Sequence, residues 1–193
     1  MSTQIVDSLD SFINAYIDLA GDDKRELQTD FDADWPSPCL LATDDELALL
    51  ADGDSTTWRP HLQAASTHLG DLAKALEINI HPDLETLFCR YYSHDLPAVT
   101  DRGELDILQA WNEDDFERLQ KNLISHVLMK RRLKQAETLF FATTDQEDFI
   151  IVMDVASGKV MLEQVGKVPK EVLADDLPSF IQTLRPRDLV LTF

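Results

Sequence analysis

The sequence WNEDDFERLQKNLISHVLMKRRLK, residues 111–134, decides the fold because it contains every signal of one long helix. Asn112 is a good N-cap, and three acids follow it in the first turn, where the helix dipole favours negative charge. The apolar residues recur at helical spacing: Phe116, Leu119, Leu123 and Val127. Four bases close the far end and suit its exposed carbonyl groups: Lys130, Arg131, Arg132 and Lys134. The pattern predicts a helix over about residues 113–133, roughly 30 Å long.

After this helix the hydrophobic period changes to that of strands. Residues 138–143 and 149–153 are short runs rich in β-branched and aromatic side chains. A turn follows at residues 154–158, in which Gly158 supplies a positive φ, and a third strand continues to Val165. The stretch therefore predicts a long helix that leads into a three-strand antiparallel meander.

Two further helices are predicted near the ends of the chain. Residues 4–20 place their apolar side chains on one face and are followed by Gly21, a natural helix stop. The last helix is capped by Asp175 or Asp176, accepts Pro178 in its first turn and ends at Pro186. The order of elements predicts a single α+β domain over residues 1–193, with a mainly antiparallel sheet packed by helices.

The middle of the chain is less periodic. Residues 22–34 are predicted as an acidic linker, residues 39–43 as a short strand and residues 61–76 as a helix. A second helix is predicted to begin at Pro82, and the pattern does not decide whether its far end is helix or strand. Residues 97–103 are predicted as a loop and residues 104–108 as a strand.

Charge is the strongest global feature of the sequence. The chain has 36 acids and 17 bases, a net charge of −19. Residues 1–110 contain 22 of these acids and 6 of the bases, so the net charge is −16 there and −3 in the rest. Such a field repels nucleic acid and anionic lipid and attracts basic protein surfaces. An acidic surface that serves only solubility is the alternative explanation.

Several classes of function lack a signal. The six scattered glycines form no phosphate-binding loop, and the five histidines have no metal-ligand spacing. The cysteines, Cys39 and Cys89, sit in apolar company and are predicted to be buried free thiols. No apolar run approaches the roughly 18 residues of a membrane span, and the first residues do not resemble a signal peptide. The sequence predicts no enzyme, no cofactor and no metal.

Several stretches together resemble the Syd family, the SecY-interacting proteins of bacteria. The similarity is densest in residues 104–166, and it includes the series Leu108 to Phe116 and the Gln120-x-Asn122-Leu123-Ile124-x-His126 pattern. Earlier landmarks are Pro36-Ser37-Pro38-Cys39 and Trp58-x-Pro60, and a later one is the segment from Leu177 to Pro186. Residues 44–57 and 61–102 match less well.

The resemblance implies a fold of the SMI1/KNR4-related group and a non-enzymatic function. A Syd-like protein is expected in the cytoplasm, peripheral on the cytoplasmic face of the inner membrane, where it is held by SecY rather than by lipid. It is expected to contact the basic cytoplasmic loops of SecY through an acidic concave groove and to monitor or regulate SecYEG complexes. The alternative is an acidic, immunity-like inhibitor of a basic toxin or nuclease.

Candidate groove residues are acids near the strand that precedes Trp111. Alternation along residues 104–108 places Glu104 and Asp106 on one face of this strand, opposite its apolar residues. The predicted partner-binding acidic face consists of Asp83, Glu85, Asp95, Glu104 and Asp106. Since a surface ion pair contributes roughly 0–1 kcal/mol, several of these acids must act together.

Overall fold

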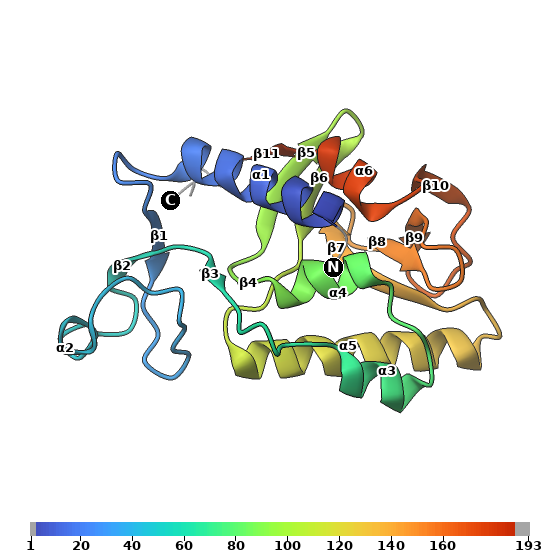
Figure 1. Ribbon diagram of the computed structural model, residues 1–193, viewed down its shortest axis with the longest axis horizontal. Helices are drawn as coiled ribbons and strands as arrows, with labels where there is room; N and C mark the ends of the chain where they lie inside the picture. The colour runs from blue at the N-terminus through green and yellow to red at the C-terminus, as the bar shows by residue number, and fades with distance from the viewer. Residues whose placement is uncertain (1–2, 188–193) are drawn as a thin grey trace.

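The computed structural model describes residues 3–187 and has an α+β fold built on a seven-stranded antiparallel sheet. The strand order is β10-β9-β8-β7-β6-β5-β11 (Figure 1). The strands are β5 (Leu96–Thr100), β6 (Gly103–Ile107), β7 (Thr138–Thr144), β8 (Phe149–Asp154), β9 (Val160–Gln164), β10 (Glu171–Ala174) and β11 (Arg185–Pro186).

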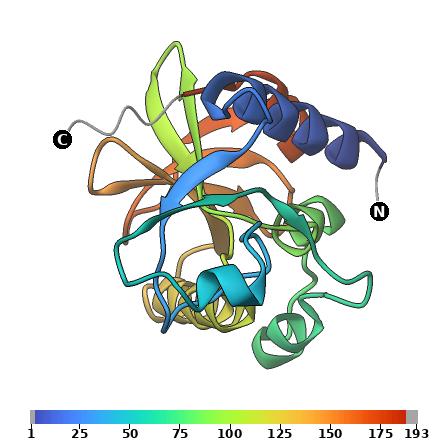
Figure 2. The same cartoon turned by 90° about the vertical axis from the view of Figure 1, so that its left-hand side faces the viewer.

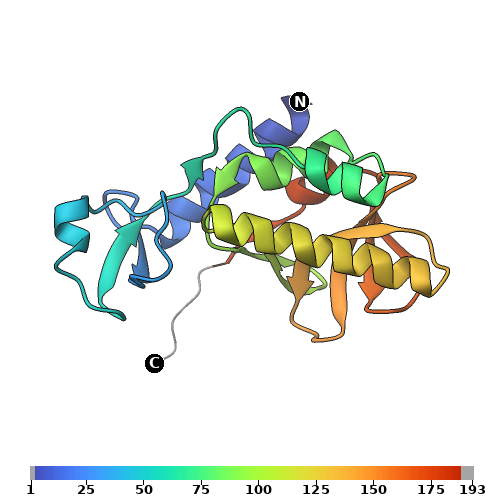
Figure 3. The same cartoon turned by 90° about the horizontal axis from the view of Figure 1, so that it is seen from below.

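Helices cover both faces of this sheet. Successive side chains of a strand point to opposite faces. Phe140 of β7 contacts His126 of α5 (Glu113–Arg132), whereas its neighbour Phe141 contacts Phe180 of α6 (Leu177–Gln182). The long helix α5 therefore lies on one face, where Figure 3 shows it running beside the strands, and α6 lies on the other. The remaining helices are α1 (Thr3–Ala20), α2 (Asp44–Leu47), α3 (Gly70–Leu76) and α4 (Pro82–Cys89).

Helix α1 completes the core on the α6 side. Its buried residues include Ile5, Leu9 and Phe12, and it packs mainly against α6. The Gln182 side-chain amide donates a hydrogen bond of 3.0 Å to the Ser8 hydroxyl. Two segments from opposite ends of the described chain thus close one hydrophobic core.

The predicted helix and meander are confirmed. The Asn112 side chain accepts a 2.8 Å hydrogen bond from the Asp115 backbone N–H and caps α5. Strands β7, β8 and β9 pair in sequence, and Gly158 has a φ of 72° in the turn between β8 and β9. Asp176 caps α6. Lys130 does not serve the exposed helix end as predicted, because it is fully buried.

Four of the predictions for the middle of the chain are wrong. The supposed linker contains β1 (Leu27–Asp30), which pairs with β2 (Ser55–Trp58). Residues 39–43 form only one bridge, from Leu40 to Trp58, in place of a strand. In the first case pairing with a distant segment overrides weak local propensity.

The other two errors concern residues 61–76 and 97–103. The first segment begins with β3 (His61–Leu62), which pairs with β4 (Tyr91–Tyr92), and becomes helical only at Gly70. The second belongs mostly to β5, where the Pro97 carbonyl accepts a 3.0 Å hydrogen bond from the Arg187 N–H although proline itself has no N–H to donate. The helix at Pro82 is confirmed, and its open far end continues into β4.

A small lobe stands beside the main sheet. Residues 27–58, here called the β1–β2 lobe, contain β1, β2 and α2 and project from the rest of the molecule (Figures 1 and 3), and Figure 2 views the lobe end-on. The Ser37 hydroxyl donates a 2.5 Å hydrogen bond to the Trp111 carbonyl, and the Asn112 amide donates one of 2.8 Å to the Pro36 carbonyl. These contacts attach the lobe to the start of α5.

Candidate partner-binding hollow

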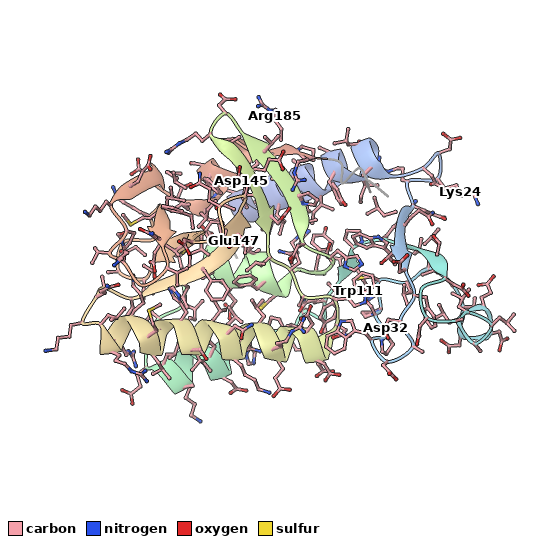
Figure 4. The ribbon with its side chains drawn as sticks, turned by 180° about the vertical axis from the view of Figure 1, so that it is seen from behind. Lys24, Asp32, Trp111, Asp145, Glu147 and Arg185 are labelled. Atoms are coloured by element: carbon pink, nitrogen blue, oxygen red, sulfur yellow. The ribbon has the colours of Figure 1, made fainter. Side chains whose placement is uncertain are left out.

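A hollow of about 450 Å³ lies where the β1–β2 lobe meets the segment before α5. Three of its lining residues are acids, Asp30, Asp32 and Asp52, and four carry aromatic rings, Phe31, Trp35, His94 and Trp111. Figure 4 shows Asp32 and Trp111 on the same side of the molecule, near the start of α5. We call this site the acidic hollow.

The rings of the acidic hollow are held by packing. Trp111 and His94 stack with their ring centroids 3.9 Å apart and their planes 13° apart. Trp58 meets both rings edge-on. The His94 Nε2 atom lies 2.9 Å from the Thr29 hydroxyl oxygen, so a strand of the lobe fixes this ring. These contacts fix the His94 and Trp111 rings in place. We call the rings of Trp35, His94 and Trp111 that line the hollow the aromatic wall.

The carboxylates come from the lobe. Asp30 ends β1 and Asp32 follows it, while Asp52 lies in the turn before β2. One Asp52 oxygen accepts from the Ala33 N–H and one Asp32 oxygen accepts from the Asp34 N–H, both at 2.9 Å. Within residues 3–187, none of the three carboxylates forms an ion pair with a basic side chain.

The surrounding sequence concentrates this charge further. Residues 22–54 contain 11 acids and 2 bases, which accounts for about half of the net charge of −19 in a short segment. No lysine or arginine is among the residues that line the acidic hollow. Low-dielectric walls around charges of one sign focus the field, so the site favours a cation.

His94, which lines the hollow, and its neighbour Asp95 have shifted pKa values. Burial lowers the pKa of His94, with a smaller opposing effect from the Asp115 carboxylate, so the ring is neutral at neutral pH. Partial desolvation of its carboxyl group raises the pKa of Asp95 to about 6, although the residue as a whole is exposed. The Gln109 N–H, which donates to Asp95 at 2.8 Å, opposes that shift, and Asp106 and Asp115 reinforce it.

Comparison with known sequences identifies the family of this chain. The family described as Syd protein (SUKH-2) matches residues 6–186. The chain belongs to the Syd family. It is 43% identical to Protein Syd of Pseudoalteromonas atlantica over 186 residues, which cover 96% of this chain and 98% of the relative. It is 42% identical to Protein Syd of Alteromonas mediterranea and 37% identical to that of Yersinia pseudotuberculosis, with the same coverage in both cases.

Three of the five acids predicted for partner binding in this Syd-family chain lie near one another. Asp95 directly follows His94 of the acidic hollow, and its carboxyl feels the charge of Asp106. The Arg187 guanidinium pairs with both remaining acids: its Nε atom lies 3.4 Å from Glu104 Oε2, and its Nη2 atom lies 3.0 Å from Asp106 Oδ1. The negative charge of these two acids is therefore partly neutralised. Whether these acids contact a partner remains a prediction.

The other two predicted acids are placed differently. Asp83 is only 6% exposed at the start of α4, and burial raises its pKa. The Glu85 carboxylate accepts a 2.9 Å hydrogen bond from the Leu69 N–H, next to the start of α3. Both acids take part in packing the helices. None of the five predicted acids is among the residues that line the acidic hollow, and Glu104 lines a second cavity instead.

Sequence reasoning missed the three acids of the hollow, Asp30, Asp32 and Asp52. It assigned Asp30 and Asp32 to an acidic linker and did not connect Asp52 with them, because nothing local reveals that β1 pairs with β2. The available signal was the run of acids in residues 22–54 with Trp35 among them.

A second cavity of the Syd-family chain differs in chemistry. It has a volume of about 410 Å³ and lies against the face of the sheet that α6 covers. Apolar residues such as Phe149, Ile151 and Leu162 line it, together with the bases Arg102 and Arg185. Of these two cavities, only the acidic hollow is lined by acids without any lysine or arginine. No helix within residues 3–187 is long and apolar enough to span a membrane.

Proposed function

We propose that this Syd-family protein docks on the basic cytoplasmic loops of SecY through the acidic hollow. Syd proteins interact with SecY, which makes SecY the first partner to consider. The observation that carries the proposal is the hollow itself, which gathers Asp30, Asp32 and Asp52 without a single lining base. Its charge is complementary to loops rich in lysine and arginine.

Docking is electrostatic in this proposal. The field of residues 22–54 attracts a positively charged loop over a distance and increases the association rate. Each exposed ion pair adds only about 0–1 kcal/mol, so affinity requires several pairs at once. The protein acts without catalysis, and it reaches the cytoplasmic face of the inner membrane by holding SecY rather than lipid. There it monitors or regulates SecYEG complexes.

The test is sedimentation of the protein with inner-membrane vesicles that contain or lack SecYEG. One variant neutralises the hollow with Asp30→Asn, Asp32→Asn and Asp52→Asn, which keeps an oxygen at each position for the backbone hydrogen bonds. The matched control neutralises the β7–β8 turn with Asp145→Asn, Glu147→Gln and Asp148→Asn. Both variants gain three positive units of net charge, and Figure 4 shows that Asp145 and Glu147 lie away from Asp32.

We expect the hollow variant to lose at least about tenfold in affinity and the control to change by less than about threefold. Raising the salt concentration from about 50 to about 500 mM should also weaken wild-type binding strongly, because screening shortens the reach of the field. Equal losses in the two variants would mean that only total charge matters. Binding that ignores SecYEG would remove SecY as the partner.

A third variant, Glu104→Gln with Asp106→Asn, tests the acids predicted from the sequence. Because Arg187 already faces both carboxylates, we expect a smaller loss than for the hollow variant.

A further inference from the structure

The aromatic wall of the acidic hollow has no role in a purely electrostatic contact. Acids on an open surface attract any cation, yet here Trp35, His94 and Trp111 line the same space as three carboxylates. The volume of about 450 Å³ falls within the roughly 300–1,000 Å³ of ligand-sized pockets. The site is thus shaped to take a side chain in addition to attracting a charge.

The chain already holds one guanidinium at this wall. The Arg118 guanidinium carbon of α5 lies 5.3 Å from the centre of the Trp35 ring. The same Arg118 donates to an Asp115 oxygen at 2.6 Å. An arginine held between an aromatic ring and a carboxylate is therefore an arrangement that this part of the protein supports.

Other features of the hollow favour a cation stacked on a ring. The electron-rich face of an indole attracts a cation by about 0.5–2 kcal/mol, more when water is excluded. Because His94 is neutral at neutral pH, this ring adds no positive charge to the wall. Asp32 and Asp52 each use one oxygen for a backbone N–H, so each has a second oxygen that can accept from a ligand.

We propose that the acidic hollow binds an arginine side chain of the partner, with its guanidinium against the aromatic wall and hydrogen-bonded to the lobe carboxylates. This inference rests on the proposed docking function and names the residue type that the hollow selects. Arginine is favoured over lysine because its planar, weakly hydrated guanidinium stacks on rings and forms two parallel hydrogen bonds to a carboxylate. An ammonium group offers the same charge without either property.

The experiment compares two synthetic basic peptides that have the same sequence, except that every arginine of one is lysine in the other. Their affinities are measured by calorimetry for the wild-type protein, for Trp35→Leu and for Trp35→Phe. Trp35 is suited to substitution because it is half-buried and its ring lies at the wall, whereas Trp111 is only 7% exposed and belongs to the core. Near-ultraviolet circular dichroism verifies that each variant is folded.

We expect the wild-type protein to bind the arginine peptide about five to ten times more tightly than the lysine peptide. Trp35→Leu should reduce this preference below about twofold, and Trp35→Phe should restore part of it. The neutralised hollow variant should lose both peptides.

Equal affinity for the two peptides would overturn the inference and leave docking on SecY intact, provided that SecYEG vesicles still bind through the hollow acids. An arginine preference that persists undiminished in Trp35→Leu would also overturn it, because the ring would then make no contribution. Failure of the proposed function is a different result, namely no dependence of vesicle binding on SecYEG.

Discussion

The Lys130 and Glu163 side chains form an ion pair that is completely removed from solvent. Their Nζ and Oε2 atoms are 2.9 Å apart, and both side chains have no exposed surface. The Thr138 hydroxyl donates to the same Glu163 oxygen at 2.8 Å, and Lys130 also donates to the Lys167 carbonyl at 3.0 Å. Because the Thr138 proton points to Glu163, its oxygen accepts from His126 Nε2, 2.9 Å away. A charge buried here is stable only while its partner is present.

Glu163→Gln should destabilise the protein by about 3–5 kcal/mol, because it leaves the Lys130 charge buried without a counter-ion. Urea unfolding at neutral pH measures the loss. The double variant Lys130→Met with Glu163→Leu is the control, since replacing both charges by apolar groups should recover most of the stability. A double variant as unstable as the single one would show that packing, rather than the unpaired charge, causes the loss.

Asp95 gives a separate prediction, for the dependence of stability on pH. Its pKa is about 6 in the folded protein and ordinarily 3.8, so the folded state holds a proton that the unfolded state has released between about pH 4 and 6. Stability from this residue therefore falls as the pH rises through that window. Asp95→Asn should be more stable than wild type near neutral pH, by less than about 1 kcal/mol because the residue keeps contact with solvent, which screens its charge. The difference should vanish below about pH 4.

Thermal unfolding across this pH range measures the effect. The side-chain amide introduced by Asp95→Asn can still accept from the Gln109 N–H, so the variant isolates the charge from the hydrogen bond. A difference that stays constant with pH would contradict the assignment.

At the level of elements, Asn112 joins α5 to the β1–β2 lobe. Its side-chain oxygen caps the helix, and its side-chain nitrogen donates to the Pro36 carbonyl. Asn112→Ala removes both bonds and should cost about 1–2 kcal/mol. Asn112→Asp keeps the cap but loses the donor, so it should leave α5 stable while the lobe becomes easier to cleave.

Urea unfolding measures the first effect, and limited proteolysis followed by mass spectrometry locates the second within residues 27–58. If both variants unfold alike and neither exposes the lobe to protease, the bond to Pro36 contributes little.

Whether a helix or strand could be predicted from the sequence depends on whether it carries its own local signals. Helix α5 and strands β7 to β9 carry their own periodicity, caps and turns, so they were predicted correctly from local signals. Strand β1 has no such pattern, because it forms only by pairing Leu27 with Trp58 far along the chain. The acidic hollow depends on that pairing, so its carboxylates could not be found locally. The Lys130–Glu163 pair likewise joins residues on different elements and could not be found locally. The one local signal was the spacing of Lys130, which lies three residues after Val127 and so continues the apolar face of α5.

For the whole molecule, the net charge of −19 links stability and binding through salt. Repulsion among the acids opposes the compact state, and ions screen it. We expect the melting temperature to rise by about 2–4 °C between low and moderate salt, corresponding to roughly 1 kcal/mol. Salt should thus stabilise the fold while it weakens docking on SecY. Calorimetric scans at several NaCl concentrations measure the first effect, and an unchanged or lower melting temperature would contradict it.

The packing of α1 on α6 has a consequence for the newly made chain. During synthesis α1 leaves the ribosome roughly 160 residues before α6, at about 5–20 residues per second. For that time Ile5, Leu9 and Phe12 lack their final neighbours, and their apolar face is open to chaperones and proteases. A chain whose translation stops before α6 therefore keeps the apolar face of α1 without its main packing partner.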